Sequence, residues 1–449
     1  MSLKAGILSA RSYLTILIGF LLGFAIVLWV ERQMPTRVET SDGIVLSKSF
    51  PPLPQPRELT FDEAVWARIA WQYFINNSQP NGLVNAEAAK PWLSLWSTGS
   101  YLLATIAAFQ LQIIPADEFD DRITSALASL GELPLQPEGL PAALYHADTL
   151  LPIASPNGNV GSAIDMGRLL MPLQILLWRY PQHAVEVNQL LAKWQLAALL
   201  QSSGPQGASL PVNRWVIRTD DPRSSYGYRL YAGSVLRLIN AAAGLAVSQP
   251  PDGLKMIEID GYAMPDEGIR TPWGKQPSLV SMPYLLSGLE QGFDARSGEI
   301  TWRLMQILQQ RTGKPENEGE INADYAEQAP DFASALPGSQ PQQEDNNHAG
   351  EALTDRALVS TRSAFAWYAL FRNHWSEALR QQMLPMIEPG KGWKAGFNPD
   401  GSMNSAVNAD TNAMVLESLS YIAHGQLLCL GCPAPASAVI SPQQGVASK

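Results

Sequence analysis

The stretch of sequence that decides the fold lies near residue 100 and reads Trp96-Ser97-Thr98-Gly99-Ser100-Tyr101-Leu102-Leu103-Ala104. It begins with small and polar residues and continues as a nearly uninterrupted apolar run. A helix that is apolar on most of its faces must be buried on most of them. The stretch therefore predicts a helix that begins at a polar entry and then runs through the interior of the protein.

Five further stretches repeat this kind of helix entry, and amphipathic segments with charged faces lie between them. The entries begin near Ser162-Ala163-Ile164-Asp165, Ser225-Tyr226-Gly227-Tyr228, Ser281-Met282-Pro283-Tyr284, Ser360-Thr361-Arg362-Ser363 and Asp410-Thr411-Asn412-Ala413. The amphipathic segments are 61–76, 117–130, 182–201, 298–311 and 374–386. Buried and half-exposed helices in alternation predict an inner ring packed against an outer ring, which is an all-α body of the (α/α)6 toroid type.

Two features leave this architecture incomplete at the level of sequence. No outer helix is visible after residue 240, because residues 255–259 look like a short strand. A superhelical stack of helical repeats is the alternative architecture, but the sequence shows no self-similarity at a fixed period. We therefore expect the toroid.

The N-terminus carries a targeting signal. Residues 13–30 form an apolar run without charge, long enough to nearly span the hydrocarbon core of a bilayer. Lys4 and Arg11 precede the run, so residues 1–12 are expected in the cytoplasm and the rest beyond the inner membrane, in the periplasm. A cleaved signal peptide is the alternative, but residues 28–31 offer no small-x-small cleavage site. The sequence thus predicts one uncleaved transmembrane helix.

The remaining chain divides into a linker, a body and a tail. Residues 31–58 are rich in proline and predict an extended linker. Thr60 and Glu63 form a capping box that begins the first helix of the toroid, which we place at residues 59–430 with a long polar loop at 313–356. Residues 431–449 predict a disordered tail. Cys429 and Cys432 near its start predict a local disulfide rather than a redox or zinc site.

Composition and missing motifs exclude several classes of function. The formal net charge of −10 argues against nucleic acid as a partner, because phosphate binding needs clustered Lys and Arg. No phosphate-binding loop, serine-nucleophile motif or cluster of metal ligands is visible, and the histidines, among them His146, His183 and His348, show no helical pairing. We therefore expect neither a cofactor nor a metal.

Several motifs, taken in order, resemble an uncharacterised bacterial family known as domain of unknown function 3131. The resemblance covers roughly residues 60–428. Its motifs are Trp71-Gln72-Tyr73-Phe74, Gly82-Leu83-Val84, Trp96–Ala104, Ser162–Leu170, Gly227-Tyr228, Pro283–Leu286 with Glu290, Arg311-Thr312-Gly313, Ser360-Thr361 and Thr411-Asn412-Ala413. That family looks like the glucoamylase-like endo-β-1,2-glucanases, which are (α/α)6 toroids. The resemblance implies work on a bacterial glycan.

The chain departs from the family pattern at two positions. An Asp usually follows the tryptophan of the first inner-helix entry, where this chain has Ser97. A Ser-Glu pair and then an Asp usually follow Thr312-Gly313, where this chain has Asn317-Glu318 and Asn322. Fewer carboxylates at these positions put hydrolysis in doubt and keep glycan binding without catalysis open.

Glycoside hydrolysis needs two carboxyl groups, and the candidates are Asp165, Glu318, Asp410 and Asp266. Each has a structural alternative. Asp165 could pair with Arg168 on the same helix face, and Asp410 could be an N-cap. Glu318, and Asp266 beside Glu267, lie in predicted loops and could be solvated. Glu290, at the far end of its helix, is expected to be structural.

Candidates for sugar contact lie at the same helix entries and in one loop. They are Trp96, Ser97, Arg168, Tyr228, Tyr284, Trp393 and Asn412. Aromatic faces stack on sugar rings, although core packing is the alternative for every aromatic residue in the set. We place Trp393 in a glycine-flanked loop, which favours the sugar contact.

The sequence thus predicts a periplasmic, membrane-anchored protein that acts on a glycan in exopolysaccharide production or export, built like a glycoside hydrolase. The alternative is a non-catalytic glycan-binding or scaffold subunit of a polysaccharide secretion machine. The expected partners are a bacterial polysaccharide, the inner membrane and proteins of polysaccharide synthesis or export.

Overall fold

The computed structural model describes residues 16–26, 44–46, 53–137, 139–153, 162–196, 226–249, 254, 256–265, 270–271, 274–275, 281–311, 360–397 and 402–428. The chain divides into two compact units, Met1–Pro51 and Pro52–Lys449. In the first unit residues 16–26 are helical, with apolar side chains such as Phe20 exposed. Within the described residues, no helix is both long enough and apolar enough to cross a bilayer.

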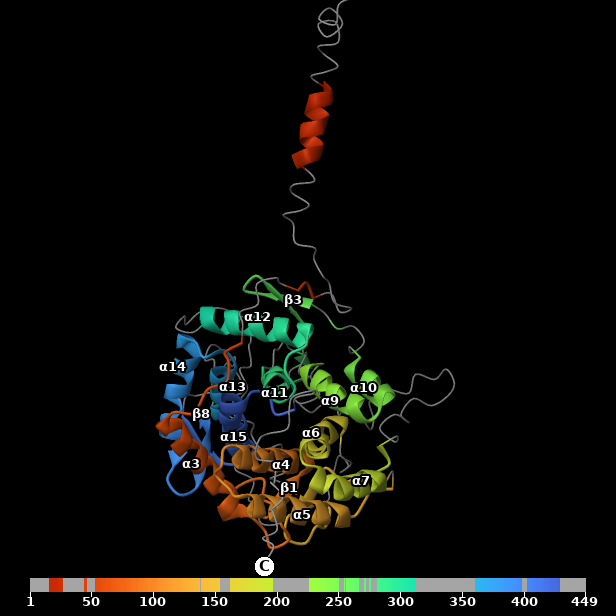
Figure 1. Ribbon diagram of the computed structural model, residues 1–449, viewed down its shortest axis with the longest axis vertical. Coiled ribbons are helices and arrows are strands. Elements are labelled where there is room, and N and C mark those ends of the chain that lie inside the picture. The colour runs from red at the N-terminus through yellow and green to blue at the C-terminus, as the bar shows by residue number, and fades with distance from the viewer. Residues whose placement is uncertain are drawn as a thin grey trace, which may run out of the picture. The chain divides into compact units, whose positions relative to one another are not determined.

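The second unit contains an inner ring of helices. Its described members are α4 (Leu95–Gln110), α6 (Ala163–Arg179), α9 (Tyr226–Ile239), α11 (Met282–Glu290), α13 (Thr361–Phe371) and α15 (Ala409–His424). Each packs against the next, and α15 packs back against α4, so the ring closes. Figure 1 shows these six helices around a common axis. The six predicted helix entries are confirmed, and the superhelical alternative is wrong.

An outer layer alternates with the inner ring along the chain. The described outer helices are α3 (Phe61–Asn77), α5 (Ala116–Glu132), α7 (Ala184–Lys193), α10 (Ala241–Ser248), α12 (Ala295–Arg311) and α14 (His374–Gln382). A short 3-10 helix, Pro181–His183, leads into α7, and another, Leu384–Met386, follows α14. Each outer helix packs against an inner neighbour, which accounts for the half-exposed pattern of their sequences.

Polar side chains at the inner-helix entries act as caps. Ser94, Ser162, Ser360 and Asn408 are the N-caps of α4, α6, α13 and α15, and each accepts a hydrogen bond from the backbone N–H three residues on. These bonds satisfy donors that the first helical turn leaves free. The small and polar cluster ahead of each apolar run therefore has a local physical cause.

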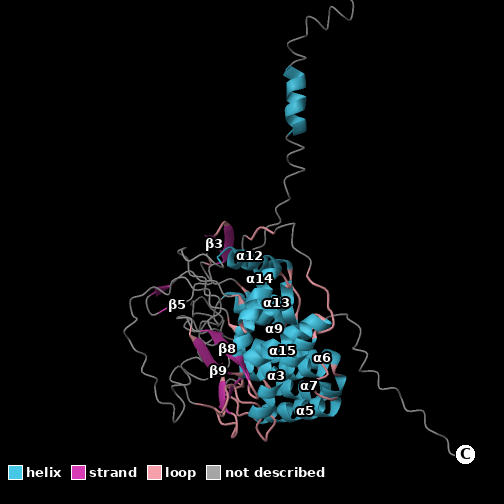
Figure 2. Cartoon of the chain, turned by 90° about the vertical axis from the view of Figure 1, so that its left-hand side faces the viewer, coloured by secondary structure: helices cyan, strands magenta, loops and turns pink. Residues whose placement is uncertain are grey.

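Short strands lie in four of the connections between an outer helix and the inner helix that follows it. They are β1 (Trp92–Ser94), β2 (Leu144–His146), β3 (Met256–Ile259), β4 (Tyr262–Pro265), β5 (Arg270–Thr271), β6 (Gly274–Lys275), β7 (Ile387–Glu388), β8 (Gly392–Phe397) and β9 (Met403–Val407). They form three antiparallel pairs, β1–β2, β3–β4 and β5–β6, and one antiparallel sheet, β7–β8–β9. Figure 2 shows β3, β5, β8 and β9 gathered on one side of the helices.

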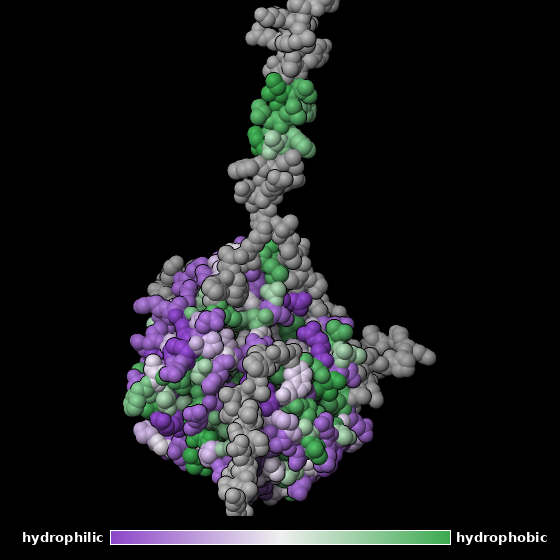
Figure 3. Space-filling view, in the orientation of Figure 1, coloured by the Kyte–Doolittle hydropathy of each residue, from purple (hydrophilic) through white to green (hydrophobic). Residues whose placement is uncertain are grey.

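The region after residue 240 contains an outer helix that the sequence pattern did not predict. The strand expected at residues 255–259 is present as β3, but the outer helix α10 precedes it. The sequence pattern did not predict α10, because this helix has no charged face. Its surface is apolar instead, and Leu245 is 57% exposed. Figure 3 shows this apolar surface in green over α10. The helix expected at 182–201 is also shorter, because α7 ends at Lys193.

The inner helices approach one another closely where glycines lie at their contacts. A Cβ on Gly99 of α4 would lie 2.6 Å from the carbonyl oxygen of Arg168 on α6. A Cβ on Gly167 of α6 would lie 2.6 Å from the Cβ of Ala232 on α9. Both distances are shorter than a carbon contact allows, so the ring at these contacts requires glycine.

We expect Gly99→Ala to lower the free energy of unfolding by about 1–3 kcal/mol, because the methyl group meets rigid backbone in a packed core. Gly131→Ala, on the outer helix α5, is the matched control. Its methyl group would meet the flexible Lys193 Nζ at 3.3 Å, so the change should be neutral or stabilising. Urea denaturation of both variants measures the difference, and equal effects would contradict the close approach of α4 and α6.

Candidate functional site

The inner helices run in the same direction, because an outer helix returns the chain between one inner helix and the next. Their N-termini therefore gather at one end of the ring, where β1 leads directly into α4 and β9 leads into α15. We call this the entry end and the opposite end the closed end. Helix N-termini present free N–H groups and a positive dipole, which suit polar or anionic ligands. The entry end is the candidate functional site.

A cluster of buried polar side chains lies on the ring axis, and we call it the axial cluster. It consists of Ser100, Arg168, Tyr231, Glu290 and Glu417, from α4, α6, α9, α11 and α15 in turn. The Arg168 guanidinium donates to Glu290 and, at 2.8 Å, to Glu417. It also donates to Ser100 Oγ at 3.2 Å, and Tyr231 donates to Glu290 at 2.7 Å.

The axial cluster is fully buried, and burial shifts the pKa values of its carboxyl groups. Burial, together with the negative charge of Glu290, raises the pKa of Glu417 to about 8, although Arg168 pulls it down. Burial also raises the pKa of Glu290, against the opposing charge of Arg168. The Glu417 carboxyl is therefore mostly protonated at neutral pH, which reduces the negative charge beside Arg168. Both glutamates are fully buried, so neither is presented to a ligand.

The sequence offered Arg168 as a sugar contact or as the partner of Asp165, and the ion-pair alternative is wrong. Arg168 is 1% exposed and pairs with Glu290 and Glu417 instead. Position along one helix could not reveal this, because both true partners come from distant parts of the chain. Glu290 is structural, as expected.

Above the axial cluster lies an aromatic layer at the entry end. The ring of Trp96, in the first turn of α4, meets Tyr228 edge-on with centroids 5.6 Å apart. The Arg168 guanidinium lies 5.4 Å from the same Trp96 ring, a cation–π distance. A Cβ on Gly227 would lie 2.9 Å from the ring of Tyr284, so Tyr284 packs beside the start of α9.

Three of the predicted sugar contacts are thus brought together, although each is closely packed. Trp96 and Tyr228 are 3% exposed and Tyr284 is 2% exposed. Sugar contact by these three residues stays a prediction.

Two polar candidates at the entry end belong to capping boxes. Asp165 accepts from the Ser162 hydroxyl at 2.7 Å and from the Ser162 N–H at 3.3 Å. Ser97 accepts from the Ser94 N–H at 2.9 Å and closes the equivalent box on α4. The hydrogen bonds of the Asp165 side chain thus stabilise the start of α6. The same side chain lies at the entry end, and its catalytic role stays a prediction.

The entry of α15 corrects one further expectation. Asn408, not Asp410, is the N-cap, and it accepts from the Thr411 N–H at 2.8 Å. Asp410 follows in the first turn, where its charge adds to burial in raising the pKa of Tyr73 on α3. Its position beside a helix N-terminus keeps it among the candidate carboxylates.

Trp393 and Asn412 contact each other. Trp393 lies in strand β8, not in a loop, and it is fully buried. Its N–H donates to Asn412 Oδ1 at 2.8 Å, and its indole donates to the carbonyl of Trp66 on α3 at 3.2 Å. These contacts join β8, α15 and α3.

Several predicted features lie outside the described residues. They are Glu318, Asp266 with Glu267, Asn322, the loop 313–356, and Cys429 with Cys432. Within the described residues, no group of three or more His, Cys, Asp or Glu side chains could hold a metal ion.

Sequence reasoning missed Glu417, Tyr231 and Ser100 as partners of Arg168. A signal existed, because Arg168, Glu290 and Glu417 are charged residues inside otherwise apolar helices. Buried charges are found almost only in pairs, so three such residues in predicted inner helices point to a shared network.

The chain matches one protein family by sequence and several solved structures by fold. A family model described as "Protein of unknown function (DUF3131)" matches residues 65–425. A glucoamylase-like protein from Bacteroides caccae superposes with a TM-score of 0.55 at 11% identity, over 81% of this chain and 94% of that one. The endo-β-1,2-glucanase from Chitinophaga pinensis, solved with sophorotriose and glucose, gives 0.54 at 12% identity, over 82% and 94%. No curated protein matches the chain by sequence.

These values show a shared fold. At 11–12% identity they do not carry the chemistry of one protein over to another.

The pKa of Glu417 predicts how stability depends on pH. Because its pKa is raised to about 8 in the fold, the folded protein holds a proton that the unfolded chain releases above its ordinary value of 4.5. Stability should therefore fall as the pH rises from about 5 to 8, by at most about 1 kcal/mol per pH unit for one proton. Glu417→Gln, which is permanently neutral, should flatten this fall.

Urea denaturation across this pH range provides the measurement. Glu118→Gln, on the outer helix α5, is the control and should follow the wild-type slope. Parallel curves for wild type and Glu417→Gln would contradict a proton held at the ring axis.

Proposed function

We propose that this chain, which belongs to the DUF3131 family, is a glycan-active protein whose site lies at the entry end of the ring. The observation that carries the proposal is the arrangement of Trp96, Tyr228 and Asp165 there. An aromatic pair and a carboxylate lie in the first turns of neighbouring inner helices, above a sealed axial cluster. Solved glycan-degrading proteins share the ring.

The proposed chemistry is hydrolysis of a bacterial polysaccharide. One carboxyl group would protonate the leaving oxygen and a second would activate water or attack the sugar. Asp165 and Asp410 are the described candidates, and Glu318 and Asp266 remain candidates from the sequence. The glucans cut by the β-1,2-glucanases of similar fold are the first substrates to test.

Ser97 favours the alternative, a glycan-binding or scaffold subunit. It occupies the position where the resemblance expects an Asp, and its hydroxyl completes a capping box. A binding protein needs the aromatic and polar surface of the entry end but no acid–base pair.

We further propose that residues 13–30 anchor the protein in the inner membrane, with the second unit in the periplasm. The support is the charge asymmetry of Lys4 and Arg11 before an apolar run. The helix of residues 16–26, with its exposed apolar side chains, is compatible with this role. The anchor would hold the protein beside membrane proteins that make or export a polysaccharide.

Incubation of the purified full-length chain with linear β-1,2-, β-1,3- and β-1,4-glucans tests the activity. We expect new reducing ends from at least one polymer. Binding without cleavage, measured by affinity electrophoresis, would favour the scaffold alternative. A chain that neither binds nor cleaves any of these glucans would contradict a glucan as the substrate.

Asp165→Asn tests the candidate carboxylate. The amide keeps an acceptor for the Ser162 N–H, so the melting temperature should change by only a few degrees. Loss of an acid–base group should lower turnover by about 10²–10⁴-fold. Glu318→Gln is the companion variant and should also lower turnover. Normal turnover in both variants would leave Asp410 and Asp266 as the carboxylates to test.

Topology is tested with reporter fusions. Alkaline phosphatase joined after Pro56 should be active, because it folds only beyond the inner membrane. A cytoplasmic reporter at the same position should be inactive. The reverse pattern would place the second unit in the cytoplasm.

A further inference from the structure

The ring is not closed by a covalent turn at every position. Five inner helices are each followed along the chain by an outer helix, from α4–α5 to α13–α14. The last inner helix, α15, instead packs against α3, the first helix of the ring. The sixth hairpin is thus made from opposite ends of the chain, and only non-covalent contacts hold it. We call the α3–α15 contact the seam.

At the entry end the seam is held by strand β8. The indole of Trp393 donates to the carbonyl of Trp66 on α3 at 3.2 Å. The backbone of Trp393 exchanges two hydrogen bonds with the side chain of Asn412 on α15, at 2.8 and 3.2 Å. The two residues that the sequence offered as sugar contacts are therefore links across the seam.

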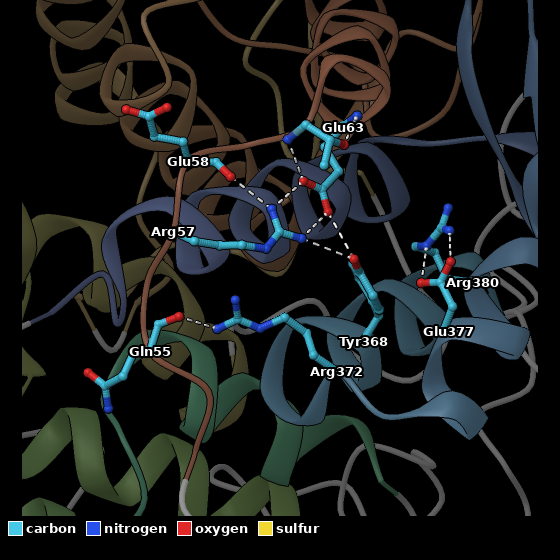
Figure 4. A network of polar contacts seen from close by, with 9 residues as sticks. Gln55, Arg57, Glu58, Glu63, Tyr368, Arg372, Glu377 and Arg380 are labelled. Atoms are coloured by element: carbon cyan, nitrogen blue, oxygen red, sulfur yellow. Dashed lines mark hydrogen bonds and ion pairs between the residues drawn. The ribbon is translucent and has the colours of Figure 1, made fainter.

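At the closed end the seam is held by the chain segment that precedes α3. Arg57 donates from both terminal nitrogens to Glu63 on α3, each at 2.7 Å. The Arg57 backbone N–H donates to the carbonyl of Ile422 on α15 at 2.8 Å. Figure 4 shows the Arg57 guanidinium lying against Glu63, with the hydroxyl of Tyr368 on α13 within hydrogen-bond distance of both. Tyr368 donates to Glu63 at 3.0 Å.

Glu63 is the common acceptor of the side-chain hydrogen bonds at the closed end of the seam. It is 1% exposed, and it also accepts from the Thr60 N–H at 2.8 Å. Burial disfavours its charged form, but the hydrogen bonds from Arg57, Thr60 and Tyr368 outweigh burial and lower its pKa to about 2. The bidentate pair is therefore charged at any ordinary pH, and bidentate arginine–carboxylate geometry is the stronger kind of ion pair.

A second arginine holds the same segment to α13. Arg372 donates to the carbonyl of Gln55 at 2.7 Å, as Figure 4 also shows. Pro56 packs 3.6 Å from the Cβ position of Gly425, just past the end of α15. Residues 55–60 thus contact α3, α13 and α15 together, although they come from a stretch whose composition predicts a linker.

We propose that residues 55–60 are a clasp that keeps the ring shut, and that the seam is the part of the ring that opens first. The other five hairpins are closed by chain connections, which limit how far their helices can separate. The seam has no such connection, so its local opening is governed by the clasp and by the β8 contacts.

The clasp links the segment before the ring to the entry end through α15. Its contact with Ile422 lies in the last turn of α15, whose first turn carries Asp410 and Asn412. Release of the clasp frees the last turn of this helix, while the β8 contacts with Asn412 still hold its first turn. The inference stands independently of the proposed glycan activity.

Hydrogen exchange of the full-length chain, read by mass spectrometry, tests the clasp. Glu63→Gln keeps the size and the capping position of the side chain but removes the charge that holds Arg57. We expect amides of α3 and α15 to exchange at least about 10-fold faster, while those of α6 and α9, across the ring, keep their rates.

Glu299→Gln is the matched control. Glu299 also forms a buried ion pair with an arginine, Arg303, but both residues belong to α12, which is not part of the seam. This variant should leave α3 and α15 at wild-type rates. Tyr368→Phe, which removes one hydrogen bond to Glu63, is the milder variant if Glu63→Gln fails to fold, and it should give a smaller effect at the same helices.

Two outcomes would overturn the proposal. One is faster exchange spread evenly over all inner helices, which would make the clasp an ordinary stabilising contact. The other is unchanged exchange at α3 and α15 in Glu63→Gln and Tyr368→Phe, which would mean that packing alone keeps the seam shut.

Discussion

The inner ring depends on one buried positive charge. Arg168 comes from α6 and is buried in the core, where an unpaired guanidinium would cost several kcal/mol. Glu290 from α11 and Glu417 from α15 neutralise it, with Tyr231 and Ser100 completing its hydrogen bonds. Each partner comes from a different inner helix, so the charge is satisfied only when five helices have the correct register. An apolar axis would be at least as stable in principle, but it would specify that register less strictly.

The same cluster gives the ring its polarity. The axis below the aromatic layer is filled by the axial cluster, and the segment 425–428 packs at the other end of the ring, where Leu428 donates to the carbonyl of Glu290. The entry end receives the strands and the capped first turns of the inner helices. The candidate catalytic and sugar-contact residues therefore lie at the entry end, and the contacts of residues 55–60 and 425–428 with the ring lie at the closed end. The seam between α3 and α15 runs from the entry end to the closed end. Trp393 and Asn412 hold it near the entry end, and Arg57 and Glu63 hold it at the closed end.

Much of this fold follows from local sequence, because its physical causes are local. A polar cap followed by an apolar run is read from neighbouring residues, and the six inner helices were predicted on that basis. The capping box of Thr60 and Glu63 was predicted for the same reason and is confirmed. The pattern did not reveal α10, since an alanine-rich helix has no polar face to create a period. The sequence analysis also extended the linker to residue 58. Proline content describes the conformation of the free chain and not the contacts that Arg57 makes once the ring has formed.

The residues of the candidate site likewise fall into those with local causes and those with long-range causes. The sequence by itself determined that Trp96, Tyr228, Tyr284 and Asp165 begin inner helices, and alternation of inner and outer helices then brings such residues to one end. Only the tertiary structure decided that Arg168 belongs to the core and that Trp393 and Asn412 belong to the seam. Glu290 and Glu417, the partners of Arg168, and Trp66, the partner of the Trp393 indole, are separated from them by more than a hundred residues in sequence. Hydrogen bonds and ion pairs act over a few ångströms of space, and separation along the chain carries no information about that distance until the ring is closed.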